Sequence, residues 1–197
     1  MLVNNWRSAH SYPLNSINMT LKQRAIRVEK TAIVYQRLKR AEAIRAKMLR
    51  QEKEHGRMFD LTSMQDLGGC RAIMSDVDKI EELLSVYEDA HKKNPDRGSI
   101  REHMDDYISQ PKDDGYRGVH LIYKYRSQAE EHALIAAREW DRSKFDGLRI
   151  EIQIRSRLQH QWASAVETAG RHIRRNIKGD GGGKSWENIW HYARRTE

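Results

Sequence analysis

Three segments of the sequence carry residue types that suit chemistry on phosphate groups with a metal ion. The first is Asp66, directly before Leu67 and a glycine pair, where a carboxylate can approach a metal–phosphate complex without hindrance from side chains. The second is Glu151, in a run of alternating polar and apolar residues. The third is the turn 111–120, which places Lys, Tyr, Arg and His around a glycine-permitted bend. A tyrosine beside cations suits a nucleotide, since the ring stacks on the base and the cations hold the phosphates.

Each of these segments also has a simpler interpretation. An isolated Asp-x-Gly is more often an Asx turn or a cap than a metal ligand. Glu151 alone could be half of a surface ion pair, and a single turn with cations is a weak signal. The three segments therefore indicate a site only if the fold brings them together.

The apolar spacing predicts the elements that must position these residues. One amphipathic helix is predicted through the first third of the chain, from an apolar stripe made of Val34, Leu38, Ala41 and Met48. If that helix is continuous, its opposite side is a solvated basic face, made of Arg37, Arg40 and Lys47.

Strands and further helices are predicted beyond this point. The run 67–74 indicates a buried strand, and the alternation in 119–125 and 148–155 is typical of strands with one buried face. Helical spacing covers 77–91, 129–140 and 156–178. This order predicts an α+β fold in which helices cover one face of a sheet. The other face carries Glu151 and Gln153, so it meets either solvent or a ligand.

Composition narrows the class of protein. The 197 residues suffice for one domain with its own core, and the formal charge of +8 favours polyanionic partners such as nucleotides or RNA. No apolar run approaches the ~18 residues that a membrane span needs, and the first residues lack the apolar stretch of a secretory signal. Cys70, the single cysteine, excludes an internal disulfide, fits a reducing compartment and is expected in the core. We therefore expect a cytoplasmic protein that does not bind membranes.

Four elements resemble, in the same order, the synthetase domain of the RelA/SpoT-type alarmone synthetases. They are a basic element, an Asp-x-Gly-x-x-Arg element, an acceptor loop, and a strand followed by a helix. In this sequence they read Arg37-Leu-Lys39-Arg-Ala-Glu-Ala43-Ile44-Arg-Ala-Lys47, Asp66-Leu-Gly-Gly-Cys-Arg71, Asp106-Tyr-Ile-Ser-Gln-Pro-Lys-Asp-Asp-Gly-Tyr-Arg-Gly-Val-His120 and Glu151-Ile-Gln-Ile-Arg-Ser-Arg-Leu-Gln-His-Gln-Trp-Ala163. The resemblance implies a nucleotidyltransferase-like mixed β-sheet flanked by helices.

The resemblance also implies a domain organisation. We expect a single synthetase domain at 31–178, preceded by a helical or extended arm at 1–30. A glycine hinge and a C-terminal helix are expected at 179–197. The hinge is similar to a P-loop in its glycines, but the first glycine position of that motif is occupied by Lys178 and no strand precedes it.

The activity that the resemblance implies is Mg²⁺-dependent transfer of pyrophosphate from ATP to the 3′-hydroxyl of GDP or GTP, giving AMP and (p)ppGpp. Asp66 and Glu151 would be the catalytic residues and bind Mg²⁺, with Glu151 as the base toward the 3′-hydroxyl. ATP would be held, with its adenine between two arginines, by Arg37, Lys39, Lys47 and Arg71. The acceptor would be bound, with guanine stacked on the tyrosine, by Lys112, Tyr116, His120, Gln153 and His160.

Three positions depart from the family pattern. Ala43 and Gly118 replace common serines, and Asp114 stands where asparagine is frequent. Asp114 adds negative charge beside the acceptor pocket, and this charge repels a polyphosphate unless a cation offsets it. The acceptor is therefore less closely specified than the ATP site.

Other functions remain open at this stage. Toxic small synthetases of the same family transfer pyrophosphate to the 3′ end of tRNA, which the charge of +8 suits, and an adenine nucleotide is a further acceptor. Some family members form homo-oligomers, and some toxic ones pair with an antitoxin protein. The alternative from another class is a catalytically dead RNA-binding module, although such a module does not need two metal-binding carboxylates.

Overall fold

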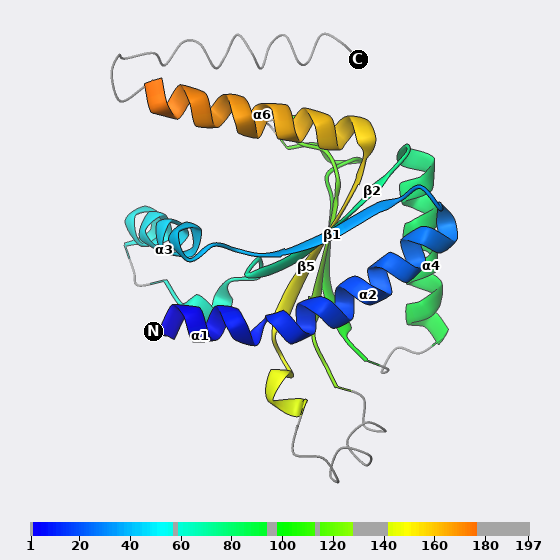
Figure 1. Cartoon of the computed structure of the whole chain (residues 1–197), viewed down its shortest axis with the longest axis horizontal. Helices are drawn as coiled ribbons and strands as arrows, with labels where there is room; N and C mark the ends of the chain where they lie inside the picture. The colour runs from blue at the N-terminus through cyan, green and yellow to red at the C-terminus, as the bar shows by residue number, and fades with distance from the viewer. Residues whose placement is uncertain (1, 57–58, 94–97, 113–114, 128–141, 177–197) are drawn as a thin grey trace.

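The computed structural model describes residues 2–56, 59–93, 98–112, 115–127 and 142–176, with side chains up to residue 168. Helices surround one central sheet (Figure 1). The helices are α1 (Leu2–Ala9), α2 (Ser11–Val28), α3 (Ala41–His55), α4 (Val77–Lys93) and α6 (Arg157–Asn176), with 3₁₀ turns η1 (Leu61–Ser63) and η2 (Ser143–Phe145). The strands are β1 (Ile33–Leu38), β2 (Gly68–Met74), β3 (Ile100–Asp106), β4 (Val119–Lys124) and β5 (Arg149–Ser156).

The five strands form one mixed sheet in the order β1-β2-β5-β4-β3. β2 and β5 are parallel neighbours at its centre, and the other three neighbouring pairs are antiparallel. A parallel pair needs a long crossover connection, and here the chain between β2 and β5 contains α4, β3 and β4. The predicted α+β class is confirmed.

The main core lies between one face of the sheet and the helices α2 and α4. β5 turns Ile150, Ile152 and Ile154 toward these helices, and none of the three is more than 1% exposed. Each helix contributes a buried stripe with helical spacing, and the two stripes consist of Leu14, Ile17, Leu21, Ala25, Ile80, Leu83 and Tyr87. Because side chains alternate along a strand, the polar residues of β5 face the opposite side. Cys70 belongs to this core, as predicted.

A second, smaller core holds α3 against the segment that leads into β2. Ile44 on α3 is fully buried against Met64 and Leu67, with Trp6 of α1 packed beside them. This contact fixes the start of β2 relative to α3. It therefore positions the residues that flank Leu67.

The continuous helix predicted through Val34 and Met48 is wrong. The residues Ile33–Leu38 form β1, and α3 begins only after that strand. Val34 and Leu38 both pack against the main core, and residues four apart share a face in a strand as well as in a helix. The β-branched and aromatic residues at 33–35 favour the strand. Arg37 therefore lies on a strand and Lys47 on a helix, so they share no helical face.

The structure confirms the other elements that were predicted within its described residues. The segments 67–74 and 119–125 contain β2 and β4, and 148–155 covers β5 except for its last residue, Ser156. The segment 77–91 lies within α4, and 156–178 contains α6. The helix at 129–140, the hinge and helix at 179–197, and Asp114 lie outside the described residues. In the part of the chain that the structure describes, no helix has the length and apolar character to cross a membrane.

The place of α2 in the core predicts that the first thirty residues contribute to stability. Leu21 is fully buried in the main core, whereas Met19 on the same helix is 55% exposed. We expect Leu21→Ala to lower the free energy of unfolding by about 2–5 kcal/mol, because it removes buried methyl groups and leaves a cavity. Met19→Ala is the matched control, with an expected change within about 0.5 kcal/mol. Urea unfolding followed by circular dichroism measures both, and equal effects would contradict this packing.

Candidate active site

Two rows of residues cross the sheet on the face opposite the main core, because residues paired in register lie side by side. One row joins Arg37 on β1, Gly69 on β2 and Glu151 on β5. The neighbouring row runs over four strands and consists of Tyr35, Arg71, Gln153 and His120. The register of the sheet thus brings together polar residues from distant parts of the chain.

Asp66 lies directly before β2 and accepts hydrogen bonds from two lysines. Lys47 on α3 donates from Nζ to Oδ1 at 2.8 Å, and Lys39 donates from Nζ to Oδ2. The backbone N–H of Lys39 also donates to the carbonyl of Leu67 at 2.8 Å, which ties the end of β1 to the start of β2. The small core around Ile44 holds α3 against the same segment. These backbone contacts therefore fix the positions of Asp66, Lys39 and Lys47 relative to one another.

The two lysines decide the charge state of Asp66. Burial alone would raise the pKa of this carboxyl, but the hydrogen bonds and charges of Lys39 and Lys47 outweigh burial and hold the pKa below its ordinary value. Asp66 is therefore ionised at neutral pH, with each oxygen on one ammonium group.

Glu151 is the second carboxylate of the site and is also held by two donors. His120 Nδ1 lies 2.9 Å from Oε1, and Gln153 donates from Nε2 to Oε2 at 2.8 Å. The Glu151 side chain is only 16% exposed. Burial would raise the pKa of this carboxyl and the charge of Asp66 acts in the same direction, but His120 and Gln153 together lower it. Glu151 is thus a buried carboxylate that stays ionised at neutral pH.

Gln153 links Glu151 to two arginines, and its contacts define the direction of its amide. Oε1 accepts from Arg71 Nε at 3.0 Å and Nη2 at 2.6 Å, and from Arg155 Nη2 at 3.1 Å. Because guanidinium groups only donate, the amide oxygen must face the arginines and the amide nitrogen must face the carboxylate. Arg71 also donates to the Tyr35 hydroxyl at 3.3 Å.

Tyr116 lies at the other end of this hydrogen-bonded row, in a cluster of rings and cations. Its hydroxyl accepts from Arg155 Nε at 2.9 Å and lies 2.5 Å from His120 Nε2. The Arg155 guanidinium lies 4.6 Å from the centre of the Tyr116 ring, and Lys112 Nζ lies 4.1 Å from that of Tyr107. Tyr107 packs edge-on against both Tyr116 and His120. The described residues of this turn, 111–112 and 115–120, therefore meet the sheet at the polar face of β4 and β5.

Gly118 explains one departure from the family pattern. Its φ of 150° lies in the region that L side chains rarely adopt, and a Cβ atom there would stand 3.2 Å from the carbonyl oxygen of Ile154. It would also stand 3.0 Å from Cγ of Arg155. In this chain a serine at 118 would strain the contact between the acceptor loop and β5.

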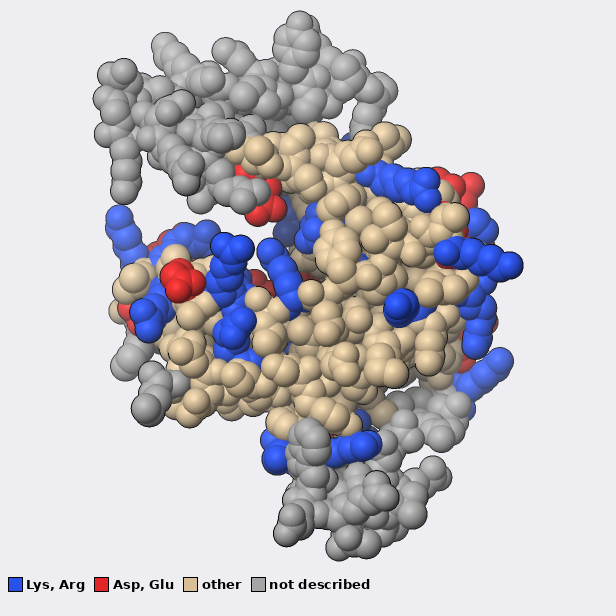
Figure 2. Space-filling view, viewed as in Figure 1, with Lys and Arg blue, Asp and Glu red and all other residues tan. Residues whose placement is uncertain are grey.

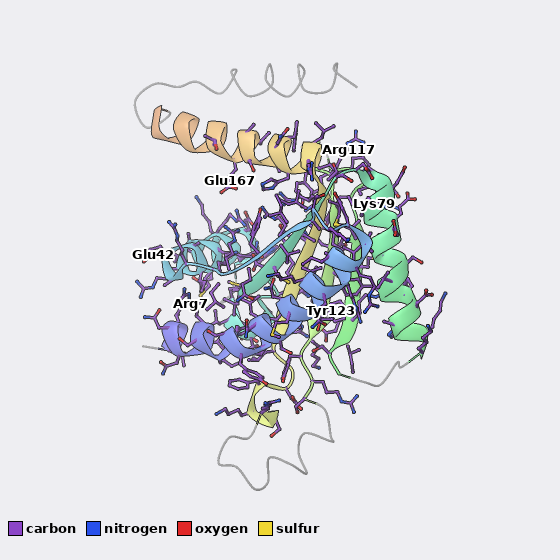
Figure 3. All side chains as sticks on the ribbon, turned by 45° about the vertical axis from the view of Figure 1, so that its right-hand side comes forward. Arg7, Glu42, Lys79, Arg117, Tyr123 and Glu167 are labelled. Atoms are coloured by element: carbon purple, nitrogen blue, oxygen red, sulfur yellow. The ribbon has the colours of Figure 1, made fainter. Side chains whose placement is uncertain are left out.

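A cavity of about 150 Å³ opens where the two rows meet the Asp66 segment. Both carboxylates border it, together with cations, aromatic and amide groups, and the full lining consists of Tyr35, Arg37, Lys39, Asp66, Gly69, Cys70, Arg71, Glu151, Gln153 and Glu167. Gly69 widens the cavity because it places no side chain between Arg37 and Glu151. Glu167 points from α6 toward this side of the molecule (Figure 3). Figure 2 shows Lys and Arg side chains gathered around α3 and β1.

The structure brings most of the predicted site residues together, in two adjoining groups. The predicted ATP residues and both carboxylates lie around the cavity or hydrogen-bond to Asp66. Of the predicted acceptor residues, Lys112, Tyr116 and His120 form the ring cluster, and Gln153 connects the two groups. His160 is separate from that cluster, because its Nε2 lies 3.5 Å from the hydroxyl of Tyr35 at the ATP side.

Residues of the site that the sequence did not single out include Tyr35, Arg155, Glu167 and Tyr107. The helix predicted from the sequence included Tyr35. The sequence therefore did not indicate that Tyr35 and Arg37 lie on one face of a strand. Arg155 shares the polar face of β5 with Glu151, and the alternation of that strand was a sufficient signal for it. Glu167 comes from a helix, and no spacing in the sequence connects it to the strands.

The ion pairs of Asp66 predict a pH-dependent contribution to stability. Its pKa is lower in the folded protein than in the unfolded chain, where it is about 3.9. The contribution is therefore complete well above pH 4 and is lost as the pH falls through the folded pKa. We expect the difference in unfolding free energy between the unmodified chain and Asp66→Asn to stay constant from pH 6 to about pH 5 and to shrink from there to about pH 2.5. Urea titrations across this range measure it, and a constant difference would contradict the ion pairs.

Comparisons with known proteins show the family and the fold of this chain. A family model described as a region found in RelA / SpoT proteins matches residues 36–172. No curated protein matches the sequence significantly. The fold is similar to that of small alarmone synthetase 2 from Bacillus subtilis, with a TM-score of 0.67, 19% identity, and coverage of 97% of this chain and 90% of that one.

Two structures of small alarmone synthetase 1 from Bacillus subtilis are also similar. One, bound to its product pppGpp, has a TM-score of 0.61 and 21% identity, and covers 92% of this chain and 84% of that one. The other, bound to AMPCPP, has a TM-score of 0.58 and 18% identity, and covers 97% and 87%. Because the family model spans most of the chain, from residue 36 to residue 172, the chain belongs to the RelA/SpoT family.

Proposed function

We propose that this protein transfers pyrophosphate from ATP to the 3′-hydroxyl of GDP or GTP, in a reaction that depends on Mg²⁺. The observation that carries the proposal is the shared cavity of Asp66 and Glu151, two ionised carboxylates from separate segments, among several cations. A binding module has no use for two such carboxylates on the wall of one cavity. Phosphate transfer needs them, because it relies on placement and on neutralisation of charge.

The residues present fit a magnesium ion. Asp66 and Glu151 border the same cavity, and each raises the cost of ionising the other, which a divalent cation would relieve. Carboxylate oxygens are ligands that Mg²⁺ accepts, and it commonly uses one or two together with phosphate oxygens of the substrate. When bound, the ion would neutralise charge on the transferred phosphates and align them. Asp66 and Glu151 are the residues that would hold it.

The ATP side of the cavity offers both planar and charged groups. Arg37 and Arg71 border it with their guanidinium groups, which stack on an aromatic base and keep a permanent charge. Arg37 forms no ion pair with an acidic side chain in the described part of the chain, so it is available to a ligand. Lys39 and Lys47 hold Asp66 in the free protein and can turn to phosphate oxygens when ATP arrives.

The acceptor side is the cluster around Tyr116. Its ring already stacks with Arg155 and lies 5.4 Å from Lys112 Nζ, which suits a guanine base followed by phosphates. In the reaction, the 3′-oxygen forms a bond to the β-phosphorus of ATP, and the bond from that phosphorus to the oxygen bridging the α-phosphate breaks. AMP leaves with the bridging oxygen, and Glu151 accepts the hydroxyl proton. Bound pppGpp and AMPCPP in the Bacillus subtilis protein support the same pair of substrates here.

The decisive test is a transfer assay with ATP labelled on its β- and γ-phosphates. We expect label on GDP or GTP when Mg²⁺ is present, and loss of transfer when EDTA removes the metal. Asp66→Asn and Glu151→Gln should each lower the rate by at least ~100-fold, because each removes a charge that holds the metal.

The control is Glu42→Gln, since Glu42 is an exposed carboxylate on α3 and outside the cavity. It should leave the rate unchanged. Bulk tRNA and ATP serve as competing acceptors in parallel reactions. Label on tRNA alone would contradict a guanine nucleotide as the acceptor, and no transfer to any acceptor would contradict the enzyme assignment.

Stacking on Tyr116 predicts a specific effect on acceptor use. Tyr116→Ala should raise the KM for the guanine nucleotide by about 5- to 150-fold, which corresponds to the loss of about 1–3 kcal/mol of stacking. The KM for ATP should change little. Tyr116→Phe keeps the ring and removes only the hydroxyl that contacts His120 and Arg155, so it separates stacking from hydrogen bonding. An unchanged acceptor KM in Tyr116→Ala would show that guanine stacks elsewhere.

A further inference from the structure

A second and larger cavity, of about 720 Å³, lies on the opposite side of the sheet. Ile152 of β5 borders it, whereas the neighbouring Glu151 and Gln153 border the first cavity. Because adjacent residues of a strand point to opposite faces, the sheet itself separates the two cavities. Tyr123, which also borders the second cavity, lies beside α2 (Figure 3).

The walls of this cavity are formed by α2 and α4. On α2 they form a stripe with steps of three and four residues, beside the buried stripe of the core, and the stripe consists of Ser16, Thr20, Gln23 and Arg27. On α4 the lining residues have the same kind of spacing and are Val86, Asp89, Ala90 and Lys93. The cavity therefore has a polar wall on α2, a wall of mixed polar and apolar residues on α4, and an aromatic and apolar floor on the sheet.

The charge of the lining is strongly positive. Its four cations are Arg24, Arg27, Lys93 and Arg126, and its one acidic residue is Asp89, so the formal balance is four minus one, or +3. None of the four cations forms an ion pair with an acidic side chain in the described ranges of the chain. Cations that no carboxylate neutralises attract an anion when they gather in a cleft, because the low-dielectric walls focus their field.

Tyr87 adds an unused hydrogen-bonding group to the floor. It borders the cavity with Arg24 4.2 Å from its ring centre, and it is only 2% exposed. Its hydroxyl oxygen is buried, and the polar group beside it, Arg24, can only donate, so the hydroxyl proton has no acceptor among the described residues. A buried polar atom without a partner is costly, so a ligand that supplies one is stabilised. Burial also raises the pKa of Tyr87, so the hydroxyl keeps its proton and can donate it.

We propose that this cavity binds a small phosphate-bearing anion, of the size of a nucleoside phosphate, at a site distinct from the active site. Its volume lies in the range of pockets that enclose small ligands, about 300–1,000 Å³. Arginine and lysine side chains match phosphate oxygens, and Ser16 and Thr20 add hydroxyl donors. The balance of +3 suits two or three phosphate charges in one compact ligand, and a cavity enclosed by two helices and a sheet does not admit a nucleic-acid duplex.

The test counts binding sites and removes the charges of one of them. Binding of GTP, ATP and inorganic tripolyphosphate to the full chain is measured by equilibrium dialysis with 1 mM EDTA. We expect two sites per chain for at least one of these probes. The double variant Arg27→Gln/Lys93→Gln, whose two side chains are exposed, should weaken one site at least tenfold and leave the rate of pyrophosphate transfer at saturating substrate unchanged.

The matched control is Lys22→Gln/Lys30→Gln, which removes two exposed charges from the same region outside the cavity. It should bind like the unmodified chain. Binding of tripolyphosphate at the second site would show that phosphate groups suffice for binding. Binding of the nucleotides but not of tripolyphosphate would show that the tyrosines contribute as well. Either result supports the proposal. A single site per chain, or equal affinities in the two double variants, would overturn it, whatever the transfer assay gives.

Discussion

The register between β2 and β5 is the constraint on which the site depends. It sets Gly69 beside Glu151 and Arg71 beside Gln153, where two buried strands run parallel. A slip by one residue would turn Glu151 into the main core and the isoleucines of β5 into the cavity. The core on the other face prevents this slip, because Ile150, Ile152 and Ile154 are almost completely buried there. Packing on one face therefore fixes the chemistry on the other.

The charged groups of the site are already paired in the free protein, and a ligand can replace these pairs with pairs of its own. Lys39 and Lys47 neutralise Asp66, and His120 and Gln153 hold Glu151, so neither carboxylate is left alone in the free protein. Phosphate oxygens of a ligand would pair with the same two lysines, and a metal ion would bind Asp66. Binding then replaces one set of ion pairs by another. This limits the cost of removing water from the charges.

The sequence was informative where a strand has two different faces. The alternation in 148–155 predicted both the isoleucine core and the polar face with Glu151 and Gln153, and the structure has both. It failed for β1, because an edge strand with Val34 and Leu38 in the core has the same four-residue spacing as a helix. The pairs Asp66–Lys47 and Tyr116–Arg155 were not predictable, since they depend on how α3 and the turn 111–120 pack against the sheet.

The second cavity follows from the same architecture. Core stripes on α2 and α4 must face the sheet, and the residues next to those stripes then line whatever space the two helices leave between them. A cavity of this kind is normally lined by apolar groups or closed by packing, because buried polar groups without partners are costly. Here α2 lines the space with Arg24 and Arg27, and α4 lines it with Lys93. Cations in that position oppose closure by mutual repulsion, so the space stays open for an anion.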